Sequence, residues 1–132
     1  IVALAALLAG CAPALREQLE GTWRSNRELT LVELSKASQL NEEQVRVLSA
    51  PEFFGDLTVI YRDGIETAIL LGSEWKARYR IVEEGPDYLD VESWDSLAGE
   101  RLTLRYRFRD GYLLVPVQEL GFHEVFSRLP DR

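Results

Sequence analysis

The sequence contains no methionine, one cysteine (Cys11) and one histidine (His123) among its 132 residues. A single cysteine excludes an intrachain disulfide, and one cysteine with one histidine cannot form a His/Cys zinc cluster. Because no methionine stands at position 1, we expect the chain to begin inside a longer open reading frame or to lack its true start. No Gly-x-Ser-x-Gly motif is present, so no Ser-His-acid arrangement is indicated. We therefore predict no enzymatic activity, no catalytic residue, no metal site and no cofactor.

Positive charge is also scarce, since 15 Lys and Arg residues face 22 Asp and Glu residues and the net charge is −7. Nucleic-acid binding depends on cations that neutralise phosphates, so this charge argues against a nucleic-acid partner. It argues equally against electrostatic attachment to anionic lipid. With 46% hydrophobic and 28% charged residues, the composition is that of one globular domain with a sizeable core.

The apolar segment at the start of the chain is too short to span a bilayer, which requires about 20 apolar residues. This segment, 1–10, reads IVALAALLAG, carries no charge and ends directly before Cys11. It fits the apolar region of a secretory signal peptide whose charged front is missing. The alternative is a buried core cysteine that follows an apolar tail.

The residues Leu8-Ala9-Gly10-Cys11 closely resemble the lipobox of bacterial lipoproteins. In that family the thiol is acylated, the signal is cut before the cysteine, and the cysteine begins the mature chain. The resemblance implies a truncated signal region at 1–10, a lipidated tether at 11–20, and a membrane partner reached through an acyl anchor on Cys11. In such lipoproteins an aspartate directly after the cysteine implies retention in the inner membrane. Position 12 is Ala12, so the resemblance implies an outer-membrane lipoprotein that faces the periplasm.

The remaining segment, 21–132, predicts one mainly β domain. Apolar residues alternate with Lys and Arg over 75–81 and with polar residues over 102–109, which is typical of half-buried strands. Asp63-Gly64 and Asp110-Gly111 are two-residue hairpin signals. Strands are expected at about 21–25, 54–62, 65–71, 75–81, 88–94, 102–109, 112–117 and 122–129. Eight strands joined by short turns favour a closed antiparallel barrel, whose interior holds side chains or one small ligand.

Two short helices are predicted after the first strand, at about 30–37 and 42–49. Thr30 with Glu33, and Asn41 with Gln44, have the spacing of capping boxes. Helices this short are marginal alone in water, so they must dock through an apolar face. Two placements remain open: a lid over the barrel mouth, or packing on the outer wall.

The domain resembles a small lipocalin-like barrel. Gly21-Thr22-Trp23 matches the G-x-W signature of the first lipocalin strand, and Arg128 stands where that family places an arginine across the tryptophan. The chain also resembles uncharacterised bacterial lipoproteins that share W-x-S-N-x-E-L-T and G-F-x-E-x-F-x-R, here at 23–30 and 121–128. The resemblance implies structural roles for Trp23 and Arg128 at the closed end of the barrel. Typical lipocalins lack the helical pair after the first strand.

Side chains on the apolar faces are the candidates for ligand binding. The aromatic candidates, which either line a pocket or fill the core, are Trp75, Tyr79, Tyr106 and Phe108. Glu124 has the parity of Phe122 and Phe126 and faces inward if they do. A buried carboxylate requires a partner, so Glu124 either anchors a polar or cationic ligand group or pairs with Arg128 or an arginine of the first strand.

Charged and polar residues of the exterior have simpler interpretations. The acidic residues around Asp90 form a solvated face or a cation site, and Arg105, Arg107 and Arg109 form a docking stripe or a soluble wall that pairs with Asp90. His123 points to solvent if the phenylalanines point inward.

The sequence thus predicts an envelope lipoprotein whose anchored barrel binds a small apolar ligand or lipid. The alternative is a non-enzymatic interaction protein or hydrolase inhibitor with a solid barrel.

Overall fold

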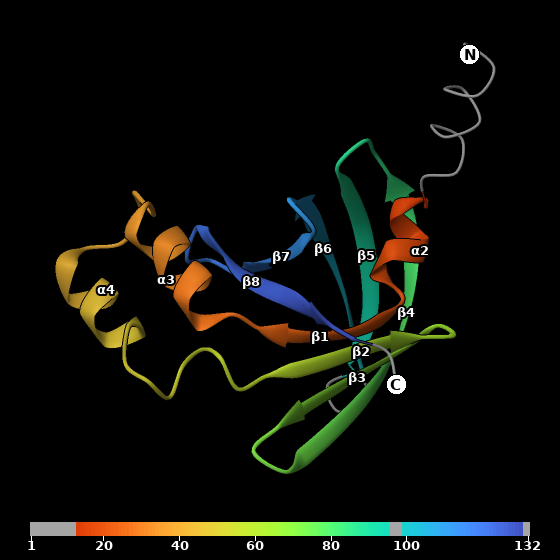
Figure 1. Cartoon of the computed structure of the whole chain (residues 1–132), viewed down its shortest axis with the longest axis horizontal. Helices are drawn as coiled ribbons and strands as arrows, with labels where there is room; N and C mark the ends of the chain where they lie inside the picture. Colours follow the sequence, from red (N-terminus) through yellow and green to blue (C-terminus); the bar gives the residue numbers. More distant parts are fainter. Residues whose placement is uncertain (1–12, 96–98, 131–132) are drawn as a thin grey trace.

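The computed structural model describes residues 13–95 and 99–130. These residues form a closed, eight-stranded antiparallel barrel, in which each strand pairs with its sequence neighbours and the last pairs with the first (Figure 1). The strands are β1 (Gly21–Ser25), β2 (Thr58–Arg62), β3 (Ile65–Leu70), β4 (Ser73–Glu84), β5 (Tyr88–Asp95), β6 (Glu100–Arg109), β7 (Tyr112–Val117) and β8 (Phe122–Leu129). The described helices are α2 (Leu15–Leu19), α3 (Arg27–Ser35) and α4 (Glu42–Leu48). The predicted fold class is therefore confirmed, and the barrel is compatible with a lipocalin-like architecture.

The strand register decides which side chains fill the interior, because residues directly opposite one another share a face of the sheet. Trp23 lies opposite both Val59 and Arg128, and Phe126 lies opposite Leu113. The buried interior cluster comprises Leu19, Trp23, Val59, Tyr61, Tyr79, Leu89, Val91, Tyr106, Leu113 and Phe126. Bulky side chains from all eight strands except β3 thus fill this part of the barrel.

Trp23 lies at the end of the barrel that α2 covers. Its side chain is 2% exposed, and its indole N–H donates a hydrogen bond to the carbonyl oxygen of Leu19 at 2.9 Å. The Arg128 guanidinium carbon lies 4.6 Å from the indole centroid. Arg128 also donates hydrogen bonds to the carbonyl oxygens of Glu20, at 2.9 Å, and Gln18. Arg128 therefore holds α2 against Trp23 by hydrogen bonds, and together they close this end of the barrel.

The helices after β1 occur where they were predicted, but the start of the first differs. Asn26, not Thr30, caps α3, because its side-chain oxygen accepts a hydrogen bond from the Leu29 N–H at 3.0 Å. Thr30 lies inside the helix, fully buried, and its hydroxyl accepts from the Val125 N–H of β8 at 2.9 Å. The predicted capping box between Asn41 and Gln44 at the start of α4 is confirmed.

The helical insert is part of the core rather than a detached flap. Leu34 of α3 is 1% exposed and forms a second buried cluster with Phe54 and Phe122. Phe122 lies opposite Val117 on the interior side of the barrel. Phe54 was predicted to belong to the second strand, but it belongs to a turn before β2 and packs edge-on against Phe122 at 5.8 Å between ring centroids.

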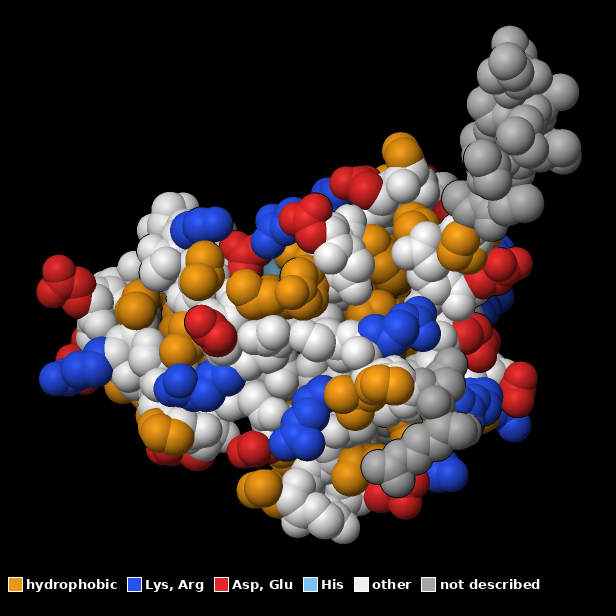
Figure 2. Space-filling model, viewed as in Figure 1, with side chains coloured by type: hydrophobic (Ala, Val, Ile, Leu, Met, Phe, Trp, Pro, Cys, Tyr) orange, Lys and Arg blue, Asp and Glu red, His pale blue; other side chains and the backbone are white. Residues whose placement is uncertain are grey.

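Helix α3 also borders the outer wall. A small cavity of about 120 Å³ lies there and is lined by residues such as Leu29, Val32, Leu114 and Val125. Figure 2 shows hydrophobic side chains gathered between α3 and strands β7 and β8. Helix α3 thus packs against the interior-facing Phe122 and lies beside Val125 on the outer side of β8, which combines the two placements that the sequence left open. Helix α4 contributes no buried residue.

Candidate functional site

The aromatic candidates are divided between the core and the surface. Tyr79 and Tyr106 are 8% and 3% exposed, and both pack edge-on against Tyr61, at centroid distances of 5.3 and 6.0 Å. The Tyr61 hydroxyl donates to the Tyr106 hydroxyl at 3.0 Å. Phe108 packs against this cluster, but Trp75 is 47% exposed near the tip of the β3–β4 hairpin. The structure therefore does not bring all four side chains together around one pocket.

The buried tyrosines stay protonated over the physiological range. Burial, followed by the neighbouring Glu20 carboxylate, raises the pKa of Tyr79 to about 12. Burial also raises the pKa of Tyr61 and of Tyr106 above their ordinary values. These hydroxyls therefore act as neutral hydrogen-bonding groups within the core.

Glu124 faces the barrel interior, with the same parity as Phe122 and Phe126. Its partner is a hydroxyl and not one of the arginines that the sequence offered as an alternative: the Ser25 side chain donates to Glu124 Oε2 at 2.6 Å. Burial raises the pKa of this carboxyl group above its ordinary value, and the hydrogen bond only partly opposes that shift.

A second interior carboxyl group, Glu66, was not predicted from the sequence. Glu66 lies opposite Tyr61 across the β2–β3 hairpin and accepts a hydrogen bond from the Ser93 hydroxyl at 3.1 Å. Burial raises its pKa as well. The signal was present in the sequence, because the two-residue turn at Asp63-Gly64 pairs Tyr61 with Glu66 directly.

We expect Glu66→Gln and Glu124→Gln each to raise the free energy of unfolding at pH 7, by about 0.5–2 kcal/mol, because a neutral amide avoids the cost of burying an ionised carboxylate. Each carboxyl group has a raised pKa in the folded state. The contribution of each wild-type carboxyl group to stability is therefore complete below its pKa in the unfolded chain, where the group is neutral. That contribution is lost as the pH rises through the pKa of the folded state. Urea denaturation at pH 7 and near pH 4 checks this, because the gain should shrink at the lower pH.

The exposed residue Glu52 provides the control for that comparison. Glu52→Gln should leave the free energy of unfolding unchanged within about 0.5 kcal/mol. A loss of stability in Glu66→Gln or Glu124→Gln at pH 7 would mean that the interior carboxylate stabilises the barrel.

A larger opening lies where β4 changes its partner strand. Residues 73–78 of β4 pair with β3, whereas residues 79–84 pair with β5. At this divergence the wall contains a groove of about 670 Å³, lined by Ile65, Lys76, Ala77, Arg78 and Trp94. None of these residues was predicted from the sequence to contact a ligand, because the candidates were chosen from strand faces expected to point inward, whereas most of the groove lining lies on the outward faces of β3, β4 and β5.

The groove combines an apolar floor with cationic side chains. Ile65 lies opposite Arg78 in the register and remains 36% exposed. The Trp94 ring has the Arg101 guanidinium at 4.9 Å and the Arg80 guanidinium at 5.8 Å from its centroid, which are cation–π distances. The sequence signal for this site was a tryptophan on the solvent side, because Trp94 has the parity of Asp90 and Glu92. The structure agrees, since Ser93 lies opposite the inward Tyr79.

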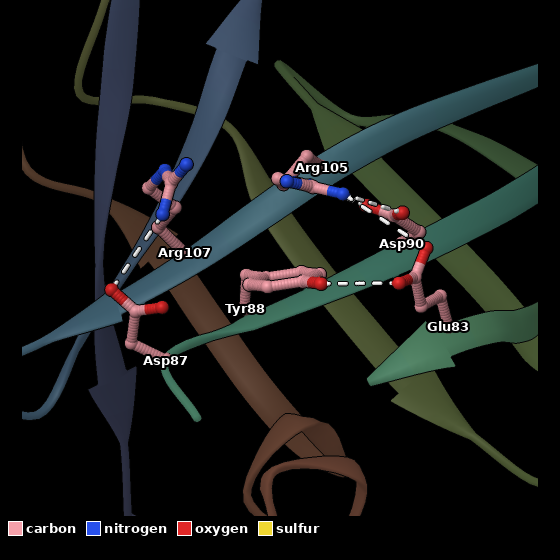
Figure 3. Close-up of polar contacts among 6 residues, drawn as sticks. All are labelled: Glu83, Asp87, Tyr88, Asp90, Arg105 and Arg107. Atoms are coloured by element: carbon pink, nitrogen blue, oxygen red, sulfur yellow. Dashed lines mark hydrogen bonds and ion pairs between the residues drawn. The ribbon is translucent and has the colours of Figure 1, made fainter. Parts of the chain in front are cut away.

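The arginine stripe of β6 is occupied by ion pairs with acidic side chains. Arg105 forms two hydrogen bonds to Asp90, at 2.8 and 3.0 Å, and its guanidinium lies 3.8 Å from the Tyr88 ring centroid (Figure 3). The Arg105 hydrogen bond lowers the pKa of Asp90. The other pairs are Arg107 with Asp87 and Arg109 with Glu33. These pairs reduce the positive charge that the stripe could offer to an acidic partner.

His123 lies beside a different surface pocket, of about 400 Å³, with Gln39 and Glu119 among its lining residues. Partial burial lowers the pKa of His123.

The described part of the chain contains no group of three or more His, Cys, Asp or Glu side chains that could hold a metal ion. Within residues 13–95 and 99–130, no helix has the length and apolar character needed to cross a membrane. The proposed lipidation residue, Cys11, lies outside the described residues.

No protein-family model matches the chain, and comparisons with curated proteins and with solved structures found no match. The function is therefore inferred from the site itself.

Proposed function

We propose that this chain is a lipid-anchored protein of the bacterial cell envelope, with a lipocalin-like barrel that binds a small, largely apolar ligand. The ligand site is the groove between the β3–β4 hairpin and the end of β5. The anchor is an acyl group on Cys11, which the lipobox-like residues Leu8 to Cys11 support. The proposed tether, 11–20, includes α2, whose Leu19 is buried in the barrel core, so the barrel would lie close to the outer membrane on its periplasmic side.

The observation that carries the ligand-binding proposal is the groove at the β4 divergence. Its volume, about 670 Å³, falls within the range of small-molecule sites, about 300–1,000 Å³. Ile65, Ala77 and Trp94 supply apolar surface, and a small number of polar groups can orient a ligand. The filled interior around Tyr61 favours this groove over the barrel lumen as the place where a ligand binds.

Native mass spectrometry of the protein purified from its host envelope tests this function. We expect wild type to carry a small molecule or to take one up from an envelope lipid extract. Trp94→Ala should lose it, because that indole forms part of the groove, whereas Trp75→Ala, which removes an exposed tryptophan outside the groove, should retain it. Retention in Trp94→Ala with loss in Trp75→Ala, or no uptake by wild type, would contradict the proposed site.

Cys11→Ser tests the anchor separately. Without the thiol, no acyl chain can be attached, so incorporation of labelled palmitate should fall to background. Because several acyl chains give stable anchoring where one gives only marginal binding, wild type should pellet with membranes in high salt and the variant should not pellet as a lipoprotein. Persistent palmitate labelling of the variant would refute the anchor.

A protein-interaction role is the second candidate, and the β3–β4 hairpin tip favours it. Leu70, Leu71 and Trp75 are 36%, 84% and 47% exposed there. Exposed apolar side chains of this kind are typical of contact surfaces. A Leu71→Asp variant that loses a cross-linked envelope partner while retaining the small ligand would support this second role.

A further inference from the structure

Two cationic side chains of the groove lack ion-pair partners among the described residues. Lys76 and Arg78 both line the groove, and neither forms an ion pair with a described carboxylate. By contrast, Arg80, on the same side of β4, is paired with Glu92 at 2.9 Å. In a chain with a net charge of −7, these two cations lie two residues apart beside a cavity, with no described carboxylate paired to them.

The two cations lie on the same face of one strand. Residues two apart on a strand share a face and are separated by about 7 Å, so Lys76 and Arg78 can approach one anionic group together. Arg62 lies opposite Ile65, which in turn lies opposite Arg78, so a third cation flanks the same side of the sheet. Glu74, two residues before Lys76, is the nearby acidic residue on that face of β4 and is not part of the described groove lining.

The interior carboxyl group of Glu66 lies on the opposite face of the sheet from the two cations. Glu66 is the register partner of Ala77, so it shares the interior parity of Ala77, whereas Lys76 and Arg78 have the opposite parity. A cationic ligand in the groove would therefore meet two like charges. An anionic group would meet two opposite charges, with apolar surface from Ile65 and Trp94 beside them.

We propose that the groove recognises the anionic head group, a carboxylate or a phosphate, of an amphiphilic ligand. Lys76 and Arg78 bind the head group, and Ile65 and Trp94 contact the apolar body. Arg78 can donate two parallel hydrogen bonds to either group, whereas Lys76 contributes a point charge. This inference rests on the proposed ligand-binding function and adds the chemical class of the ligand.

A matched series of eight-carbon probes tests the inference: octanoate, octyl phosphate, octanol and octylammonium, each below its micellar concentration. The protein is the full chain with Cys11→Ser, so that no attached acyl chain competes for the groove. Dissociation constants come from NMR titrations that follow the Trp94 indole N–H. The Trp23 indole N–H, which is bonded to Leu19 in the core, serves as an internal control that should not shift.

We expect octanoate or octyl phosphate to bind at least tenfold more tightly than octanol, and octylammonium to bind no better than octanol. The preferred anion identifies the head group as carboxylate or phosphate. Lys76→Gln/Arg78→Gln should reduce anion binding to within about twofold of octanol binding, whereas Arg107→Gln, which alters a paired arginine outside the groove lining, should leave it unchanged. The anion preference should weaken as salt is raised.

The outcomes separate this inference from the proposed function. If octanol binds as tightly as both anions, or if the double variant keeps the anion preference, recognition of an anionic head group is refuted and the ligand-binding groove stands. If no probe shifts the Trp94 signal, both the inference and the proposed groove function are refuted.

Discussion

Replacing Trp23 by alanine should lower the free energy of unfolding by about 3–5 kcal/mol, the cost typical of truncating a large aromatic side chain in a core. Trp23 is 2% exposed and packs edge-on against Phe108 at 6.4 Å between ring centroids. The substitution also leaves the Leu19 carbonyl oxygen without its indole donor and removes the surface under the Arg128 guanidinium. Urea denaturation monitored by circular dichroism measures the change.

Trp75→Ala is the matched control for this prediction, since it removes the same side chain from a position that is 47% exposed. Its cost should stay below about 1 kcal/mol, because substitutions away from the core have small effects. A cost below about 1 kcal/mol for Trp23→Ala as well would mean that the match of Gly21-Thr22-Trp23 to the lipocalin signature is accidental.

The strand order was predictable because local signals specify it. Asp63 and Asp110 have φ values of 52° and 54°, and the following residues, Gly64 and Gly111, have 76° and 81°. Two consecutive positive φ values form the tight turn that matches the twist of a hairpin, and Asp-Gly is a preferred pair for it. Alternation on either side of these turns then fixes which face is buried.

The groove was not predictable from the same signals. It arises where β4 exchanges β3 for β5 as its partner, and periodicity does not encode the residue at which a long strand changes neighbours. The predicted start of the helix α3 was wrong for a related reason. Thr30 and Glu33 have the spacing of a cap, but Asn26 supplies the actual cap one turn earlier and Thr30 instead bonds to β8, a contact distant in sequence.

The helical insert provides the second prediction with a large effect. Leu34→Ala should lower the free energy of unfolding by about 2–5 kcal/mol, because Leu34 is 1% exposed and the Phe54 and Phe122 rings beside it can only partly fill the cavity. Val47→Ala in α4 is the control, since Val47 is 49% exposed and its truncation should change stability by no more than about 0.5 kcal/mol.

Hydrogen exchange distinguishes the roles of the two helices. Amides of α3 should exchange slowly, because Thr30 and Leu34 fasten this helix to the barrel, whereas amides of α4, which buries no residue, should exchange faster. If Leu34→Ala costs less than about 1 kcal/mol and the α3 amides exchange as fast as those of α4, the whole insert is a mobile lid. If Leu34→Ala instead has the large cost expected and the α3 amides exchange slowly, deletion of residues 30–50 should unfold the barrel. The deletion exposes Phe122 and leaves the Val125 N–H without the Thr30 hydroxyl as its acceptor.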